Sequence, residues 1–179
     1  AIDAFKKSIE LQPRAIPFHS NMLLNLHYVP ELSPNEIFEE HKKWASTHLT
    51  GLPTPPAFNN TKDAKRKLKL GIVSPDFRQH TVMAFIEPFL AALDHKNLEV
   101  FAYSSVLRPD QETEKVKKLV DHFIDIRGMT DMQASGQIRK DGIDVLVDLA
   151  GHTAGHRLVL FALKPAPIQI AQFGYPDTT

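Results

Sequence analysis

The chain has 179 residues, enough for one domain with a hydrophobic core and a smaller appendage. Its 21 Lys and Arg residues balance 21 Asp and Glu residues, so charge gives no reason to expect nucleic acid or an acidic membrane as a partner. The absence of cysteine excludes disulfides, thiolate zinc sites and cysteine nucleophiles, and no apolar run reaches the roughly 20 residues of a membrane helix. This composition suits a reducing cytosol, and we expect a cytoplasmic protein.

The first 66 residues predict helices followed by a linker. Residues 1–11 carry an apolar stripe at the helical period, and the following proline ends it. Their pattern matches the second helix of a tetratricopeptide repeat, although any amphipathic helix is the alternative. Residues 18–29 predict a second helix, and Ser33 with Glu36 forms a helix start that introduces a third. Residues 50–66 hold three prolines and most of a basic run, which favours a solvated linker over a binding patch.

From residue 67 onward, short apolar strands alternate with helices. The expected strands span residues 68–74, 99–104, 123–126, 144–150 and 168–173. The expected helices span residues 82–93, 111–121, 131–140 and 157–163. This alternation predicts an α/β fold, a Rossmann-like doubly wound parallel sheet covered by helices on both faces. The predicted organisation is a repeat end at 1–13, a helical segment with linker at 14–66 and a Rossmann-like half-domain at 67–179.

Ligands of such sheets bind beyond the carboxyl ends of the strands. That rule selects the loops at 74–81, 105–110 and 150–157, with the segment after 173 as a fourth.

The first of these loops offers a carboxylate, a guanidinium and an imidazole, from Asp76, Arg78 and His80. It is not glycine-rich, so a dinucleotide-type phosphate cradle is excluded. A histidine at the carboxyl end of a strand, just before a helix, can act as a general base, and a helix amino terminus favours its neutral form. The alternative is that His80 or Asp76 only caps the helix.

The loop at 148–157 contains two histidines four residues apart, His152 and His156, close to Asp148. On a helix this spacing would suit a metal, but glycines interrupt the helix. A glycine-containing turn can instead receive an anion or sugar hydroxyls on its backbone amides, with Arg157 as a clamp. The last segment begins with Phe173 and Gly174, where glycine permits close backbone approach. Neither end has the character of a natural terminus, and we expect the chain to be a piece of a longer protein.

Three segments in this order resemble a known family: residues 19–45, 71–82 and 141–179. They are similar to the amino-terminal catalytic half of the tetratricopeptide-linked protein O-GlcNAc transferases, including SPINDLY-like relatives. The resemblance covers essentially the whole chain. It implies one half of a GT-B glycosyltransferase that moves N-acetylglucosamine from UDP-GlcNAc to serine or threonine hydroxyls, with inversion and without an essential metal or other cofactor.

The resemblance also implies residue roles. Its proposed proton acceptors and cleft residues correspond to His80, Asp76 and His19. The positions that it places at the sugar or at the acceptor correspond to Met22, Leu23, Thr153, Arg157, Phe173, Gly174, Tyr175 and Pro176. The implied partners are a nucleotide sugar, protein or peptide acceptors and a carboxyl-terminal catalytic half, without which the chain should be inactive.

Three alternatives stay open at this point. The donor could be another nucleotide sugar, such as the GDP-fucose that SPINDLY-type relatives use. The chain could belong to a repeat-linked scaffold that binds proteins without catalysis. It could also belong to a metal-dependent hydrolase that uses Asp148, His152 and His156.

Overall fold

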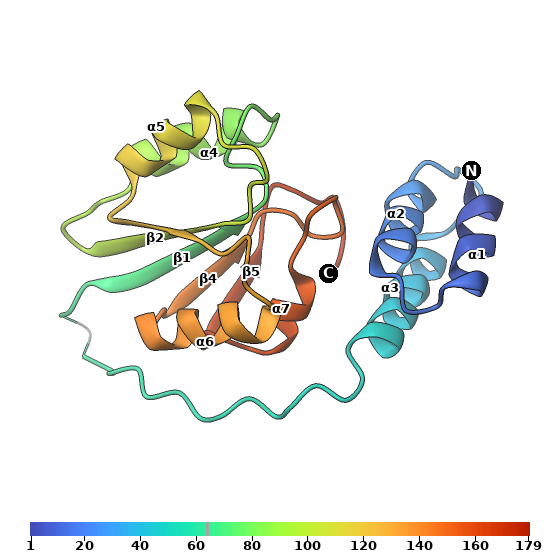
Figure 1. Cartoon of the computed structure of the whole chain (residues 1–179), viewed down its shortest axis with the longest axis horizontal. Helices are drawn as coiled ribbons and strands as arrows, with labels where there is room; N and C mark the ends of the chain where they lie inside the picture. Colours follow the sequence, from blue (N-terminus) through green and yellow to red (C-terminus); the bar gives the residue numbers. More distant parts are fainter. Residues whose placement is uncertain (64) are drawn as a thin grey trace.

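A helical segment precedes an α/β unit in the computed structural model, which describes residues 1–63 and 65–179 (Figure 1). The helices are α1 (Ile2–Leu11), α2 (Ile16–Leu26) and α3 (Pro34–His48), as the sequence predicted. The hydroxyl of Ser33 accepts a hydrogen bond from the Glu36 amide, and the Glu36 carboxylate accepts one from the Ser33 amide. This capping box satisfies backbone donors at the start of α3.

The α/β unit is built on a parallel sheet of five strands in the order β3-β2-β1-β4-β5. The strands are β1 (Leu68–Ser74), β2 (Leu98–Ser104), β3 (His122–Asp125), β4 (Val145–Asp148) and β5 (Ile168–Ala171). In the register, Leu70 of β1 lies opposite Val100 of β2 and Val145 of β4. The carboxyl ends of all five strands therefore lie on one side of the sheet, which we call the carboxyl edge. We call the side where the strands begin the amino edge.

Helices cover both faces of this sheet (Figure 1). They are α4 (Met83–Ala91), α5 (Gln111–Leu119), α6 (Asp131–Asp141) and α7 (Leu158–Ala162). Helices α4 and α5 share one apolar cluster, in which Ile72, Ile86 and Val116 are buried. Helices α6 and α7 share a second cluster on the other face, with Ile138 and Leu160 fully buried. The helices on both faces confirm the predicted doubly wound fold. Apolar strands of a parallel sheet need such cover on both sides.

The helical segment lies beyond the carboxyl ends of the strands, and an extended linker joins α3 to β1 (Figure 1). A third apolar cluster, with Leu23 and Trp44 among its members, joins the helices to Leu158 of α7. The predicted linker includes residue 64, which lies outside the described residues. Among the residues described, no helix has the length and apolar character needed to span a membrane.

Candidate functional site

A cavity of about 570 Å³ opens at the carboxyl edge of the sheet, and we call it the carboxyl-edge pocket. Residues from 75–78, 105–108 and 154–157 line it, together with Arg127 after β3. Three of the loops that the sequence placed at the rim therefore share one cavity, in the position where open parallel sheets bind ligands.

Asp76 and His80 lie at this edge, in the loop after β1. The buried Asp76 carboxylate accepts a hydrogen bond from Arg78 Nη2 at 3.0 Å, and its Oδ2 is 3.8 Å from His80 Nδ1. That separation exceeds hydrogen-bond length. The His80 side chain is 40% exposed, so its imidazole can reach a substrate.

The Nδ1 atom of His80 already has a local partner. It accepts a hydrogen bond from the Val82 amide at 3.3 Å, in the turn that leads into α4. In the neutral ring with this bond, the proton is on Nε2. The capping role and the base role therefore compete for one lone pair, and His80 must release Val82 before it can take a proton through Nδ1.

Thr153 and Arg157 brace the loop after β4. The Thr153 hydroxyl donates to the Ala150 carbonyl at 2.8 Å. Arg157 Nε donates to Asp131 at 2.6 Å, and its terminal nitrogens donate to two carbonyl groups that follow β3. With only 13% of its side chain exposed, Arg157 is not the freely available clamp that the sequence suggested. An anion would have to share its guanidinium with these partners.

A cluster of six histidines joins the helical segment to the loop after β4 and to the last segment of the chain. The histidine cluster consists of His19, His27, His41, His48, His152 and His156. At its centre, Ser20 Oγ of α2 is 2.9 Å from His156 Nε2 and 3.3 Å from His152 Nδ1. The Trp44 ring packs edge-on against His152, with 4.7 Å between centroids.

Burial keeps the centre of this cluster neutral. It lowers the pKa of His152 to about 3 and that of His156 to about 4. Burial and the neighbouring His48 lower the pKa of His19 to about 4, and His19 Nδ1 lies 3.1 Å from His48 Nε2. His19 is therefore a neutral and largely enclosed group, only 6% exposed.

The metal alternative finds no geometric support. Within residues 1–63 and 65–179, no group of three or more His, Asp or Glu side chains is placed to hold a metal ion. Asp148 instead accepts hydrogen bonds from the amides of Ala150 and Gly151 at 3.0 and 2.9 Å. Burial outweighs these bonds and raises the pKa of Asp148 to about 6. His152 and His156 turn to Ser20, which leaves the hydrolase hypothesis without a site.

The segment at 173–176 passes between the two parts of the molecule. Phe173 has a φ of 65° and stacks on Phe85 in the first turn of α4, with 5.9 Å between the ring centroids. A Cβ atom at position 174 would overlap the Leu149 carbonyl, so Gly174 is required for this close approach. Both phenyl rings remain about half exposed, which leaves an aromatic surface at the carboxyl edge.

Tyr175 follows and enters the histidine cluster. Its hydroxyl is 2.8 Å from His41 Nε2 and 3.2 Å from His27 Nε2. Burial raises the pKa of this phenol, so the hydroxyl keeps its proton and can donate to one ring while accepting from the other. Pro176 is exposed beside it. Tyr175 therefore anchors the segment, and Phe173 and Pro176 are the members that face solvent.

Met22 and Leu23 both lie on α2 in the helical segment. Leu23 is fully buried in the apolar cluster of the helices. Met22 is 4% exposed and lines a cavity of about 420 Å³ together with residues of α1 and α3. Contact of either side chain with a sugar stays a prediction.

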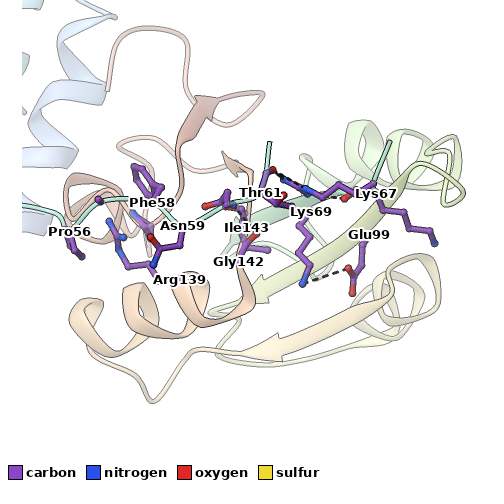
Figure 2. A pocket seen from close by; sticks show the side chains of 14 residues that line it. Pro56, Phe58, Asn59, Thr61, Lys67, Lys69, Glu99, Arg139, Gly142 and Ile143 are labelled. Atoms are coloured by element: carbon purple, nitrogen blue, oxygen red, sulfur yellow. Dashed lines mark hydrogen bonds and ion pairs between the residues drawn. The ribbon is translucent and has the colours of Figure 1, made fainter. Parts of the chain in front are cut away.

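A larger cavity, of about 740 Å³, lies at the amino edge, and we call it the amino-edge pocket (Figure 2). Three polar residues of its lining donate hydrogen bonds to the neighbouring carboxylate of Asp144. Asp144 receives two bonds from Arg66 at 2.6 Å, one from Asn60 at 2.7 Å and one from the Lys69 amide at 2.9 Å. The guanidinium of Arg139 lies 4.7 Å from the Phe58 ring centroid. These contacts fasten the linker to the sheet.

The sequence reasoning missed two arginines and much of the histidine cluster. Arg108 and Arg127 line the carboxyl-edge pocket, just after β2 and β3. Their positions beyond strand ends could have selected them. No local signal could have brought His41 and His48 into contact with a loop a hundred residues away.

Comparisons with known proteins agree with this geometry. The family described as Glycosyl transferase family 41 matches residues 11–179. The chain is 37% identical over 182 residues to a protein of Oryza sativa subsp. japonica named "Probable UDP-N-acetylglucosamine--peptide N-acetylglucosaminyltransferase SPINDLY", covering 99% of this chain and 20% of that protein. An Arabidopsis thaliana protein named as the corresponding SEC transferase is 31% identical over 74% of this chain and 13% of its own length.

A solved structure has the same fold. A mutant of the Thermobaculum terrenum O-GlcNAc transferase superposes with a TM-score of 0.89 at 34% identity, covering 97% of this chain and 33% of that one. The chain thus spans about one fifth of the length of the curated SPINDLY relatives and about one third of the solved chain. From the family match and the near-complete coverage at these identities, we conclude that the chain belongs to glycosyl transferase family 41.

Proposed function

We propose that this chain forms one wall of the active site of a protein O-glycosyltransferase. The complete enzyme would move N-acetylglucosamine from UDP-GlcNAc to serine or threonine hydroxyls of proteins. A new bond would form between the acceptor oxygen and the anomeric carbon, and the bond to the diphosphate would break, so that UDP leaves and the anomeric carbon is inverted. Because the chain spans only a fifth of its relatives, we expect it to show no turnover alone.

The position of His80 carries this proposal. Its half-exposed imidazole lies at the carboxyl edge, 3.8 Å from the carboxylate of Asp76, which lines the carboxyl-edge pocket. A hydroxyl that attacks an anomeric carbon has to lose its proton, and a neutral histidine can receive it. Once His80 releases the Val82 amide, Nδ1 would be the accepting atom, and the nearby Asp76 carboxyl group could stabilise the resulting imidazolium.

The other groups of the edge would position the acceptor. The exposed ring of Phe173, stacked on Phe85, offers an apolar surface for the sugar or the peptide. The histidine cluster would keep the helical segment and residues 173–176 in a fixed relation to His80, and placement of the reactants is a major source of rate in such transfers. His19 would act within that support.

The test uses the complete enzyme that contains this chain. We would incubate it with UDP-GlcNAc and a mixed protein extract and detect hexosamine mass shifts by mass spectrometry. Transfer should fall at least about 100-fold in His80→Ala, because a general base typically contributes that much. His95→Ala is the matched control: its side chain is also 40% exposed, but it lies at the opposite edge, before β2.

Each outcome selects one interpretation. Equal transfer by wild type and His80→Ala would retire His80 as the base, and Asp76→Asn would be examined next. If UDP-GlcNAc gives no transfer, GDP-fucose is the second donor to try, since relatives 37% and 36% identical to this chain are named SPINDLY. Absence of transfer with both donors would favour the scaffold alternative.

A further inference from the structure

Four guanidinium groups gather around the carboxyl-edge pocket, one from each loop that forms it. They belong to Arg78, Arg108, Arg127 and Arg157. Three of them are paired with carboxylates: Arg78 with Asp76, Arg127 with Asp125 and Arg157 with Asp131. Within the described part of the chain, Arg108 has neither an ion pair nor a hydrogen bond from its side chain. The cluster therefore keeps about one positive charge without a partner.

The free charge lies on the open side of the pocket. Arg108 is exposed, and the side chains of Arg78 and Arg127 are 42% and 43% exposed. Arg127 also donates to the Leu107 carbonyl at 3.2 Å, which holds its guanidinium beside the loop that carries Arg108. A planar guanidinium offers parallel donors that match the two oxygens of a carboxylate or phosphate. The guanidinium groups of Arg78 and Arg127 are held in place by their partners before a ligand arrives.

The walls of the pocket indicate what kind of molecule carries the anion. Leu107 is 79% exposed at its rim, and Ala154 and Gly155 form a small-residue wall opposite. The buried hydroxyl of Ser105, in the loop that carries Leu107, has no hydrogen-bond partner among the described residues. Apolar groups beside exposed cationic groups suit a polypeptide with one acidic side chain better than a bare nucleotide diphosphate.

The pocket also adjoins the group that would take the acceptor's proton. Asp76 lines the pocket, and its carboxylate is 3.8 Å from His80. A polypeptide with its hydroxyl at His80 would run past the arginines within a few residues, since an extended chain advances only about 3.3 Å per residue. We propose that the carboxyl-edge pocket binds a carboxylate or phosphate on the acceptor protein, close in sequence to the modified hydroxyl. This proposal rests on the proposed function.

The test measures binding of acceptor peptides directly. Fluorescently labelled peptides, each with one serine and with Glu or Gln at a single flanking position, would be titrated into the complete enzyme by fluorescence polarisation. At one or more positions the Glu peptide should bind about 10-fold more tightly than its Gln partner, the size of one charge-assisted hydrogen bond. The difference should shrink at high salt. A phosphoserine at the same position should match or exceed Glu.

Arg108→Gln is the diagnostic variant, because its side chain has no structural partner to lose in the described chain. It should abolish most of the Glu preference. Lys118→Gln is the matched control: this exposed lysine on α5 also loses one charge, but it lies near the end of its helix, toward the amino edge. The control should keep the full preference.

Three results would decide against the proposal. One is equal binding of Glu and Gln peptides at every position, and another is a preference that survives Arg108→Gln. The third is loss of the Glu preference of the wild-type enzyme when UDP is added, which would assign the pocket to the donor's diphosphate. A Glu preference without any sugar transfer would instead retire the proposed function and leave an acidic-peptide site.

Discussion

The two edges of the sheet are built from similar residues but used differently. Both carry arginines, carboxylates and a cavity, and the amino-edge pocket is the larger of the two. At the amino edge, Asp144 accepts four hydrogen bonds from three residues of the linker and β1, so this carboxylate is satisfied by the protein itself. At the carboxyl edge, Arg108 and the Ser105 hydroxyl have no partner in the described chain. Unsatisfied polar groups, rather than cavity size, indicate where a ligand belongs.

The two edges also hold their neighbouring segments by different forces. The linker is fastened by charged hydrogen bonds, whereas the helical segment is held by aromatic and neutral imidazole rings around Trp44 and Ser20. This contrast predicts that truncation of an apolar side chain, or a fall in pH, destabilises the packing of the helical segment at the carboxyl edge. Loss of one carboxylate should instead destabilise the attachment of the linker at the amino edge.

Trp44→Ala should have the largest effect on stability. Trp44 is 2% exposed and touches three rings of the histidine cluster, so its removal should cost about 4 kcal/mol of unfolding free energy. Urea unfolding followed by circular dichroism measures it. Phe38→Ala on the exposed side of α3 is the control and should cost under about 1 kcal/mol. Similar losses in both variants would mean that the cluster does not hold the helical segment.

Acid should have the next largest effect. Folded His152 and His156 bind protons only near pH 3 to 4, while the unfolded chain binds them near 6.5, so stability falls as the pH drops below 6.5. Asp148 acts in the opposite sense: its folded pKa of about 6 exceeds the ordinary 3.8, so it adds stability as the pH falls from 6 toward 4. Between pH 7.5 and 5, these three groups together should lower the free energy of unfolding by about 2.5 kcal/mol, and His19, whose folded pKa is also about 4, adds to the loss in the same sense.

Urea titrations at the two pH values measure this slope, and His152→Gln should reduce it by removing one titrating group. His95→Gln, at an exposed position, should leave the slope unchanged. A slope that persists in full in His152→Gln would show that the buried cluster is not its source.

Asp144→Ala should have the smallest of these effects. It leaves Arg66, Asn60 and the Lys69 amide without their acceptor and should cost about 2 kcal/mol, since part of the site can be rehydrated. Sugar transfer by the complete enzyme should be unchanged. Asp125→Ala, at the carboxyl edge, removes an exposed partner of Arg127 and should cost about 0.5 kcal/mol. A larger loss of unfolding free energy in Asp125→Ala than in Asp144→Ala would contradict the division between a structural amino edge and a ligand-binding carboxyl edge.

The sequence predicted the fold well because the signals for it are local. Apolar runs such as 145–149 and the capping pattern at Ser33 depend only on neighbours a few residues away. The rim loops followed from the general rule about strand ends, and that rule located Asp76, His80 and the loop of Arg108.

The packing of the helical segment could not be predicted in this way. Ser20 and His156 are separated by 136 positions, and Leu23 is buried because α7 happens to lie against it. The sequence of a helix with two apolar faces does not reveal which face a distant segment of the chain will cover. The same holds for Arg157, whose partners come from the loop after β3.

The strand order also determines when each part of the chain can become ordered during synthesis. Strands β1, β2 and β3 leave the ribosome in succession and can pair at once, whereas β4 must add to the free side of β1 later. The helices α1 to α3 are made before the sheet, yet their partners His152, His156 and Tyr175 are made after four of its strands. We therefore expect the helical segment to remain with its apolar faces uncovered until residues 152–175 have been made, and to depend most on chaperones in that interval.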